Sequence, residues 1–380
     1  MRLMFRAYAA SCLAMLSFAP ALRAQTVAVD GAVGKKLEVD GALLDSLGRQ
    51  SRLMKLFTPE DRYAGAFEQS GAGLRRVLEV AGVVKKTDDG FQRPLDVYLV
   101  ATSDRGRRAV FSYGEIFDAA DPGAILIADK ARLVIPGHHD AKALAEWDRG
   151  FLGLPERERP GVAACSSCHG GPKPPPIATL RGFGLVPGGD RRSERFLSGL
   201  KELHLCQAGP LAGATGKRGE ASRVDGTTLV LPDGTRVALT PKLTKGLPVV
   251  SWSDANFGEG RGYRGEHSFR GVGMSAVLER ALGRPLDMKR VLLLATASDG
   301  YRAVFSGGEI AFNSLGESLI LADAEDGKAF DPEDGRYRLV PRLDFFVDRS
   351  VRSVKELRLI EIAEGSDPCG LPTPAAASAP

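Results

Sequence analysis

Hydrophobic positions along the chain follow a helical period in some stretches and form short continuous runs in others, and this succession occurs twice. Apolar residues at helical spacing predict two short helices, and the apolar runs bounded by turn residues predict buried strands. The predicted helices cover 73–83 and 273–282, and the predicted strands cover 97–102, 108–112, 200–205, 291–296, 302–306 and 354–362. The pattern therefore indicates a mixed α+β unit that is present twice.

An internal repeat links the two sets of elements. Tyr63-Ala64-Gly65 matches Tyr263-Arg264-Gly265 at an offset of 200, and Arg108–Ser112 matches Arg302–Ser306 at an offset of 194. Further on, Leu185-Val186-Pro187 matches Leu339-Val340-Pro341 at an offset of 154. The offset falls by 194 − 154 = 40, which predicts an insertion of 40 residues in the first copy.

The repeat predicts where the parts of the chain begin and end. We expect a first unit over 25–206 with the insertion at about 131–184, and a second unit over 225–362. A second partial match leaves open a start for the insertion after residue 137. The Gly-rich stretch 207–224 is predicted to be a linker, and the Pro/Ala/Ser-rich stretch 363–380 a disordered tail.

The N-terminus predicts export. Arg2 and Arg6 precede an apolar, uncharged run over 7–20, and Ala21-Leu22-Arg23-Ala24 resembles a cleavage site, so 1–24 is predicted to be a signal peptide. We therefore expect a periplasmic protein, and no later run is long enough to predict a transmembrane anchor. Removal of the leader would lower the formal charge from +4 to 4 − 3 = +1. The remaining basic residues are scattered among acids, which argues against nucleic-acid binding.

Cys165-Ser166-Ser167-Cys168-His169 has the spacing of a c-type haem attachment site. Two thiols one helical turn apart can add to the two vinyl groups of one porphyrin, and the adjacent imidazole can reach the iron. Two alternatives stay open. His138 and His139 could complete a structural zinc site with the two cysteines, or the cysteines could form a disulfide.

The second axial ligand is predicted to be a histidine. No methionine occurs between Met54 and Met274, so His138 or His139 is the expected ligand, unless both are simply exposed. His204 and His267 are interpreted as structural.

Three other groups of residues have interpretations that the sequence alone does not separate. Cys206 and Cys369, each just past a closing strand, are predicted either to form a disulfide or to be two free thiols. Two acidic positions recur in both copies, as Glu115 with Glu309 and as Asp129 with Asp323. Their recurrence favours a structural role over a catalytic one.

The repeated residues resemble the sulfite-oxidase-type molybdopterin-binding domain. The matching features are the Tyr-x-Gly lead, the stretch Ala-Thr-Ala-Ser-Asp-Gly-Tyr-Arg-Ala-Val-Phe-Ser at 295–306, Leu-Ile-Leu-Ala-Asp at 319–323, Arg-Leu-Val-Pro at 338–341 and Ser-Val-Lys-Glu-Leu at 353–357. The resemblance implies two tandem α/β units of this fold. In active members a cysteine ahead of the Tyr-x-Gly region ligates molybdenum, but no cysteine lies between 25 and 164 or between 207 and 368.

A molybdopterin is the second cofactor to consider. The resemblance would place it against Arg349, Arg352 and Lys355, and the alternative interpretation of these residues is solvated charges near a closing strand. The sequence thus predicts an exported electron-transfer protein with one covalent haem c and a periplasmic redox partner. The alternatives are a non-redox binding module with a zinc- or disulfide-stapled insertion, and a molybdopterin-dependent oxidoreductase with a haem relay.

Overall fold

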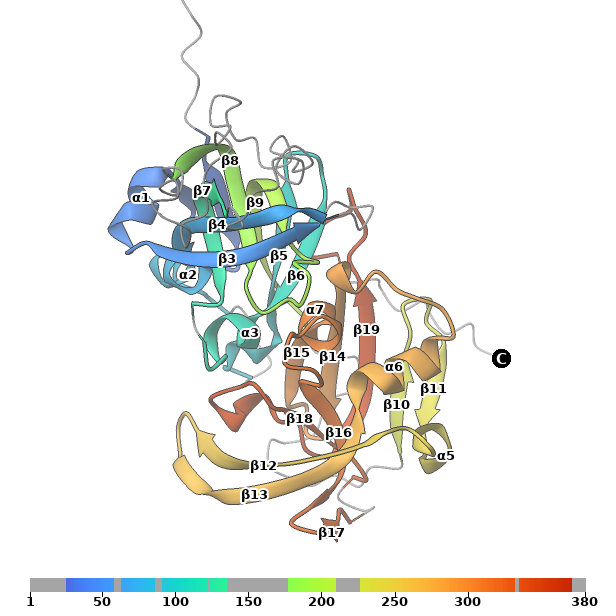
Figure 1. Ribbon diagram of the computed structural model, residues 1–380. Helices are drawn as coiled ribbons and strands as arrows, with labels where there is room; N and C mark the ends of the chain where they lie inside the picture. The colour runs from blue at the N-terminus through green and yellow to red at the C-terminus, as the bar shows by residue number, and fades with distance from the viewer. Residues whose placement is uncertain are drawn as a thin grey trace, which may run out of the picture.

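The structure is a computed structural model that describes residues 25–57, 63–85, 91–121, 123–134, 177–209, 226–331 and 335–370. We call residues 25–209 the first half and residues 226–370 the second half. Each half is built mainly of strands, and the two halves lie one above the other in Figure 1. Across the described residues, no helix has the length and apolar character needed to cross a membrane.

The first half forms one sheet. The strand order is β2-β1-β9-β8-β7-β4-β3, with β5 paired to both β9 and β6. Its elements are β1 (Val27–Gly31), β2 (Leu37–Val39), α1 (Gly41–Ser46), β3 (Gln50–Phe57), β4 (Tyr63–Gly73), α2 (Leu74–Ala81), η1 (Pro94–Asp96), β5 (Val97–Ser103), β6 (Arg108–Ser112), α3 (Tyr113–Phe117), β7 (Ile125–Leu133), β8 (Ala178–Pro187) and β9 (Leu197–Gln207).

The second half forms two sheets, ordered β11-β10-β19-β14-β15 and β12-β13-β16-β17, with β18 paired to β16. Its elements are β10 (Thr227–Val230), β11 (Arg236–Leu239), α5 (Pro241–Thr244), β12 (Val249–Gly258), β13 (Gly262–Gly273), α6 (Met274–Leu282), η4 (Met288–Arg290), β14 (Val291–Ala297), β15 (Arg302–Ser306), α7 (Gly307–Ala311), β16 (Leu319–Glu325), β17 (Lys328–Ala329), β18 (Arg338–Pro341), η5 (Val347–Arg349) and β19 (Val354–Glu361).

The strand pairings of the first half recur in the second. The parallel pair β1–β9 aligns Ala28 with Glu202, and the parallel pair β10–β19 aligns Thr228 with Glu356. The antiparallel pairs β5–β9 and β14–β19 also correspond. The halves differ because β8 is ten residues long and pairs with β9, whereas β18 has four residues and pairs only with β16.

The predicted helices and strands are confirmed, with ends that differ by a few residues. The helices run over Leu74–Ala81 and Met274–Leu282, and the closing strands over Leu197–Gln207 and Val354–Glu361. The long hairpins β3–β4 and β12–β13 were not predicted. One signal for them is a glycine that recurs in both copies, Gly71 and Gly271. A Cβ at Gly71 would lie 1.8 Å from the Ile127 carbonyl oxygen, because β4 and β7 approach closely at a bulge.

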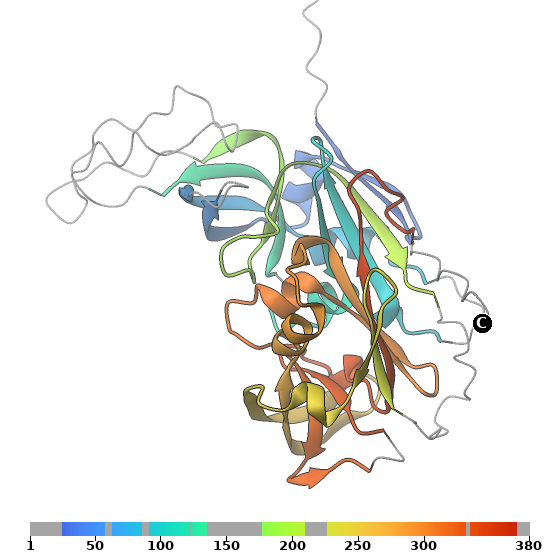
Figure 2. The same ribbon diagram turned by 90° about the vertical axis from the view of Figure 1, so that its right-hand side faces the viewer.

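The predicted insertion falls within the β7–β8 hairpin. β7 and β8 pair as far as Ala131 with Ala178, so both strands extend into the predicted range 131–184. The two strands lie side by side in Figure 2, and residues 135–176, which come between them in the sequence, lie outside the described ranges. The signal peptide, the linker from 210 to 225 and residues 371–380 also lie outside the described ranges.

The two halves pack through an apolar layer on matching strands. Tyr98, Val100 and Val110 of the first half meet their counterparts Leu292, Leu294 and Val304, and all are buried. The same layer contains Cys206, Ala208, Ile360 and Ile362. Each half has its main core on the opposite face of these strands, and Phe91 and Leu95 of the first half belong to the core of the second. Burial of this layer favours a fixed arrangement of the two halves.

Residues 363–370, predicted as the start of a disordered tail, are instead held in place. Cys369 forms a disulfide with Cys206, with the two Cα atoms 5.2 Å apart. Arg108 donates from Nη1 to the Ala363 carbonyl at 2.7 Å and from Nη2 to the Ser366 carbonyl at 2.7 Å. The composition did not indicate this order because it comes from contacts with the first half.

Candidate functional site

A buried arginine of the first half reaches the boundary between the halves. Arg195 lies in the segment between β8 and β9, and its Nη2 donates to Asp190 Oδ1 at 2.6 Å. Its Nη1 donates to Glu115 Oε2 at 2.9 Å, to the Val110 carbonyl at 3.2 Å and, across the boundary, to Ser306 Oγ at 3.1 Å. These bonds satisfy a guanidinium that has almost no contact with water.

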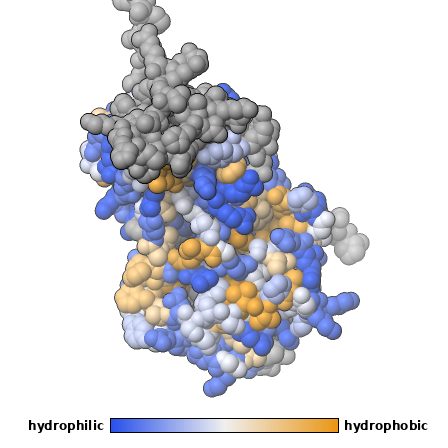
Figure 3. Space-filling view, in the orientation of Figure 1, coloured by the Kyte–Doolittle hydropathy of each residue, from blue (hydrophilic) through white to orange (hydrophobic). Residues whose placement is uncertain are grey.

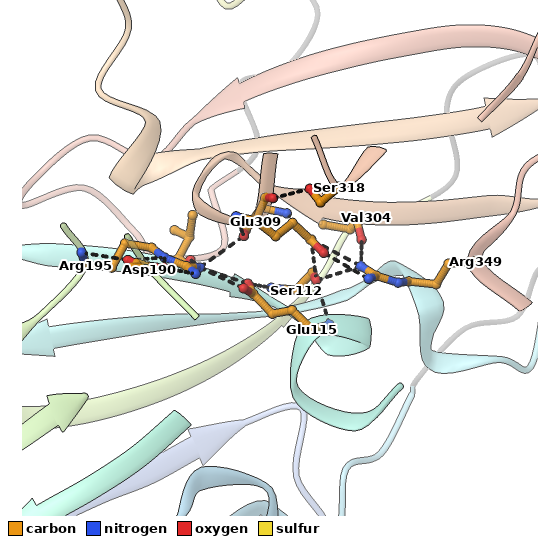
Figure 4. A network of polar contacts seen from close by, with 10 residues as sticks. Ser112, Glu115, Asp190, Arg195, Val304, Glu309, Ser318 and Arg349 are labelled. Atoms are coloured by element: carbon orange, nitrogen blue, oxygen red, sulfur yellow. Dashed lines mark hydrogen bonds and ion pairs between the residues drawn. The ribbon is translucent and has the colours of Figure 1, made fainter. Parts of the chain in front are cut away.

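The second half contributes a matching arginine (Figure 4). Arg349 Nη2 donates to Glu309 Oε2 at 2.9 Å, and Nη1 donates to the Val304 carbonyl at 3.3 Å. Nη2 also donates to Asp344 Oδ1 at 2.5 Å. Nη1 also donates to Ser112 Oγ of the first half at 2.9 Å. Every partner of Arg349 corresponds to a partner of Arg195 by the offsets of the internal repeat, so the two clusters are related by an approximate twofold axis.

Short helices position the carboxylates. Ser112 and Glu115 form a capping box at the start of α3, and Ser306 and Glu309 form another at the start of α7. The helix-capping serines are therefore also the acceptors for the arginine of the other half. The Ser112 hydroxyl donates in turn to Glu309 Oε1 at 2.7 Å.

Glycines leave the space that the arginines occupy. A Cβ at Gly308 would lie 2.1 Å from Arg195 Nε, and a Cβ at Gly114 would lie 2.0 Å from Arg349 Nε. Each guanidinium also lies over an aromatic ring of its own half, Phe111 at 4.3 Å and Phe305 at 4.7 Å from the ring centroid. The glycines and rings together restrict each arginine to one position.

The site contains more acids than bases. Two arginines face four carboxylates, those of Glu115, Glu309, Asp190 and Asp344. Burial raises the pKa of Glu115 to about 7, against the opposing effect of Arg195 and with a further contribution from the Glu309 charge. Burial also raises the pKa of Asp344. The cluster therefore holds a proton more readily than isolated carboxylates would.

A cavity of about 310 Å³ lies beside the clusters, between the two halves. Its lining includes both arginines and all four carboxylates, together with pairs of residues that the repeat relates. Those pairs are Ala119 with Asn313, Ala120 with Ser314, Ala124 with Ser318, and Ile125 with Leu319. Both halves thus contribute equivalent walls, and the cavity exists only when they are assembled.

An apolar patch covers the second half near the β12–β13 turn, at the lower left of Figure 3. Phe257, Phe345 and Phe346 form it, with ring centroids 5.0 to 6.0 Å apart. Phe345 is more than half exposed. At the corresponding place in the first half, Arg192 lies over Phe57, so this patch is a property of the second half alone.

The recurring acids have structural partners. Glu115 and Glu309 cap helices and bind the two arginines, and Asp129 accepts from Arg49 Nη1 at 2.7 Å. Asp323 is 3.3 Å from Arg270. The interpretation of Arg349 as a solvated charge was wrong, because its side chain is only 2% exposed and pairs with two carboxylates.

The residues predicted for the haem site are not described. Cys165, Cys168, His169, His138 and His139 all fall within 135–176. The two described histidines have carboxylate neighbours: His204 Nδ1 lies 2.5 Å from Asp30 Oδ1, and His267 Nδ1 lies 2.9 Å from Asp326 Oδ2.

A molybdopterin does not fit the described residues. The cysteines in the described ranges are Cys206 and Cys369, whose disulfide leaves no thiolate for molybdenum. Arg349, the first of the three residues expected to hold the pterin, is fully engaged by Asp344, Glu309 and Ser112. Arg352 and Lys355 are exposed.

Sequence reasoning missed Arg195, Asp190 and Asp344. A signal was present: Pro187-x-x-Asp190-x-x-x-x-Arg195 recurs as Pro341-x-x-Asp344-x-x-x-x-Arg349 at the offset of 154. The pattern becomes interpretable only with the knowledge that each arginine donates to a serine of the other half.

No family model and no curated protein matches this chain. Among solved structures, the chain is similar to the sulfane dehydrogenase SoxCD from Paracoccus pantotrophus. The identity is 12%, the TM-score is 0.29, and the match covers 89% of this chain and 78% of that chain.

Proposed function

We propose that this chain is an exported c-type haem protein that transfers electrons to or from a periplasmic redox partner. The observation that carries the proposal is the Cys165-Ser166-Ser167-Cys168-His169 spacing, which supplies two thiols and an imidazole in the order that covalent haem attachment requires. The N-terminal export signal agrees with it, because the leader would bring the chain to a compartment where haem c is attached.

The scaffold is proposed to be a tandem duplication of a sulfite-oxidase-like unit. Its support is the constant offsets of the repeated residues and the recurring strand pairings of the two halves. The segment that carries the two cysteines leaves one half between β7 and β8, whose strands still pair beside it. Such a position lets a haem segment be added without breaking either core.

The roles of the haem-site residues follow from donor chemistry. Cys165 and Cys168 would hold the porphyrin by thioether bonds, and His169 would bind the iron from one face. His138 or His139 is proposed as the second axial ligand, because the sequence offers no methionine nearby. The bound group would supply a one-electron couple, and two imidazole ligands would set its potential below that of a His/Met cytochrome.

Two other functions use the same residues. In the first, a zinc ion or a disulfide staples the insertion and the duplicated fold binds a ligand or partner without redox chemistry. In the second, the chain is a molybdopterin-dependent oxidoreductase with a haem relay, which the absence of a free cysteine thiol among the described residues disfavours.

The test is expression in a periplasm that contains a haem-attachment system. We expect the intact mass to rise by about one haem, with a Soret band that survives denaturation. Cys168→Ala should reduce or abolish both signals, and Cys206→Ser serves as the matched cysteine control that should retain them. Apo-protein alone under these conditions would overturn the proposal, and bound zinc that is lost when Cys165 and Cys168 are both replaced by serine would favour the stapled insertion.

A further inference from the structure

Three metal-ligating side chains converge on the first half, away from the boundary clusters. The parallel pair β1–β9 aligns Asp30 with His204, and Glu202 lies two residues before His204 on the same face of β9. His204 Nδ1 lies 2.5 Å from Asp30 Oδ1 and 3.6 Å from Glu202 Oε1. One donor atom from each residue lies within 4.8 Å of the other two.

Two of these donor atoms are buried without a hydrogen bond. Asp30 Oδ1 and His204 Nδ1 are both inaccessible to water and lie 2.5 Å apart as an ion pair, but neither takes part in a hydrogen bond of normal geometry. Buried polar atoms are stabilised by well-aligned partners, and a cation bound between these two would give each atom such a partner. We propose that Asp30, Glu202 and His204 form a binding site for a first-row divalent metal ion such as Zn²⁺.

The group is not a general feature of the fold. The register of β10–β19 places Val230, Glu356 and Arg358 at the equivalent positions of the second half. There Arg358 Nε donates to Glu356 Oε1 at 3.0 Å, which is an ordinary ion pair. Glu115 and Glu309, by contrast, recur in both halves with the same structural role. The Asp30, Glu202 and His204 group occurs in one half only, as expected for a binding site that was added to a duplicated scaffold.

The donor set determines the class of metal. One imidazole nitrogen and two carboxylate oxygens suit Zn²⁺ and Co²⁺. Ligand atoms on a tetrahedral zinc ion lie roughly 3.3 Å apart, so the 2.5 Å contact would lengthen and the 3.6 Å contact would shorten. The side chains of His204, Asp30 and Glu202 are 22%, 27% and 37% exposed, which leaves the remaining coordination position to water.

Two neighbours affect the site. Lys36 Nζ is 4.0 Å from Asp30 Oδ2. Because the Lys36 side chain is highly exposed, a metal ion can displace it from Asp30. The Cys206 and Cys369 sulfur atoms also lie within 4.8 Å of a His204 ring nitrogen, but their disulfide withholds them as ligands. The binding experiment is therefore done without reductant.

The second half provides a matched control. His267 lies 2.9 Å from Asp326 and 3.4 Å from Glu325, so it also has an imidazole beside two carboxylates. Here, however, His267 Nδ1 and Asp326 Oδ2 are joined by a hydrogen bond at 2.9 Å, and Asp326 Oδ1 accepts from the Ser268 amide at 2.8 Å, so these donor atoms already have partners. We expect His267→Ala to leave metal binding unchanged.

The experiment titrates Zn²⁺ into the full chain carrying Cys165→Ser and Cys168→Ser, which removes the alternative zinc site and the haem. Calorimetry should show one site, and Co²⁺ should give the visible absorption of a tetrahedral complex. His204→Ala and Asp30→Asn should each weaken binding by at least about tenfold, and Glu202→Gln should weaken it less.

Absence of binding in the parent protein, or equal affinity in the His204→Ala and His267→Ala variants, would overturn the proposal. Circular dichroism of each variant shows whether a loss of binding comes from unfolding, and the conservative Asp30→Asn and Glu202→Gln changes test the site if His204→Ala does not fold. The outcome is independent of the haem proposal, because the titrated protein has no haem-attachment cysteines.

Discussion

Arg349 of the second half donates from Nη1 to the Ser112 hydroxyl of the first half at 2.9 Å. The reverse contact, from Arg195 to Ser306, is 3.1 Å long. Each serine is also the N-cap of a short helix, so the contact joins the capping of a helix in one half to the packing of the other half. The two halves are therefore held together by reciprocal polar contacts as well as by the apolar layer around Tyr98 and Leu294.

Removal of one arginine should destabilise the protein strongly. Arg349→Met leaves the Asp344 and Glu309 carboxylates buried without their cation, and breaking a buried pair in this way costs about 3–5 kcal/mol. Urea denaturation measures the loss. Arg352→Met is the control, because Arg352 is exposed, and it should change the free energy of unfolding by less than about 0.5 kcal/mol. An equal effect of the two substitutions would contradict the importance of the cluster.

The stability of the protein should fall as the pH rises from about 4 to about 7, in part because of Asp118. Burial raises the pKa of Asp118 from 3.8 to about 7, and its Oδ2 has no hydrogen-bond partner. Between these values the folded protein keeps a proton that the unfolded chain releases, so the contribution is complete below the unfolded pKa and is lost as the pH passes the folded pKa.

Asp118→Asn should therefore reduce the difference in free energy of unfolding between pH 5 and pH 8. Glu115, whose pKa is also raised to about 7, should retain part of the slope. Asp121→Asn, which removes a surface carboxylate paired with Arg52, is the control. A pH profile that is the same in the Asp118→Asn variant and the wild type would count against this assignment.

The disulfide should stabilise the arrangement of the halves. Cys206 and Cys369 are separated by 163 residues in sequence, and loss of a bridge that closes a long loop typically costs about 2–5 kcal/mol. Cys206→Ser and Cys369→Ser should lower the free energy of unfolding by similar amounts. Reductant should lower the free energy of unfolding of the wild type and leave that of the two variants unchanged. Thiol titration of the denatured, unreduced wild type should detect neither cysteine; reaction of both would show that the bridge does not form.

The segment that is proposed to carry the haem should be separable from the fold. β7 and β8 pair up to Ala131 and Ala178, so a short Gly/Ser linker in place of residues 135–176 can close the hairpin. We expect the shortened protein to keep the far-ultraviolet circular dichroism of a folded chain and to lack the Soret band. Global unfolding of this variant would mean that the segment forms part of the core of the first half.

Periodicity and repetition predicted much of the fold. The helix at 274–282 and the strands at 291–297 and 302–306 could be predicted because their apolar residues are contiguous or helically spaced, which depends on local sequence alone. The hairpins β3–β4 and β12–β13 escaped this reasoning, since β3 and β12 lie at sheet edges and are largely exposed, so neither carries a buried apolar run.

By itself, the sequence predicted the repeated order of helices and strands and an insertion in the first copy, and it fixed the spacing of Cys165, Cys168 and His169. Only the tertiary structure decided that Arg349 is buried against Asp344 and Glu309, that Cys369 bonds to Cys206, and that Asp30 meets His204. Local patterns record which face of an element is apolar, whereas the contacts of Arg349 with Glu309, of Cys369 with Cys206 and of Asp30 with His204 join residues that are far apart in the chain. Their geometry follows from how the strands pair and how the two halves pack, and neither is encoded in any single stretch of residues.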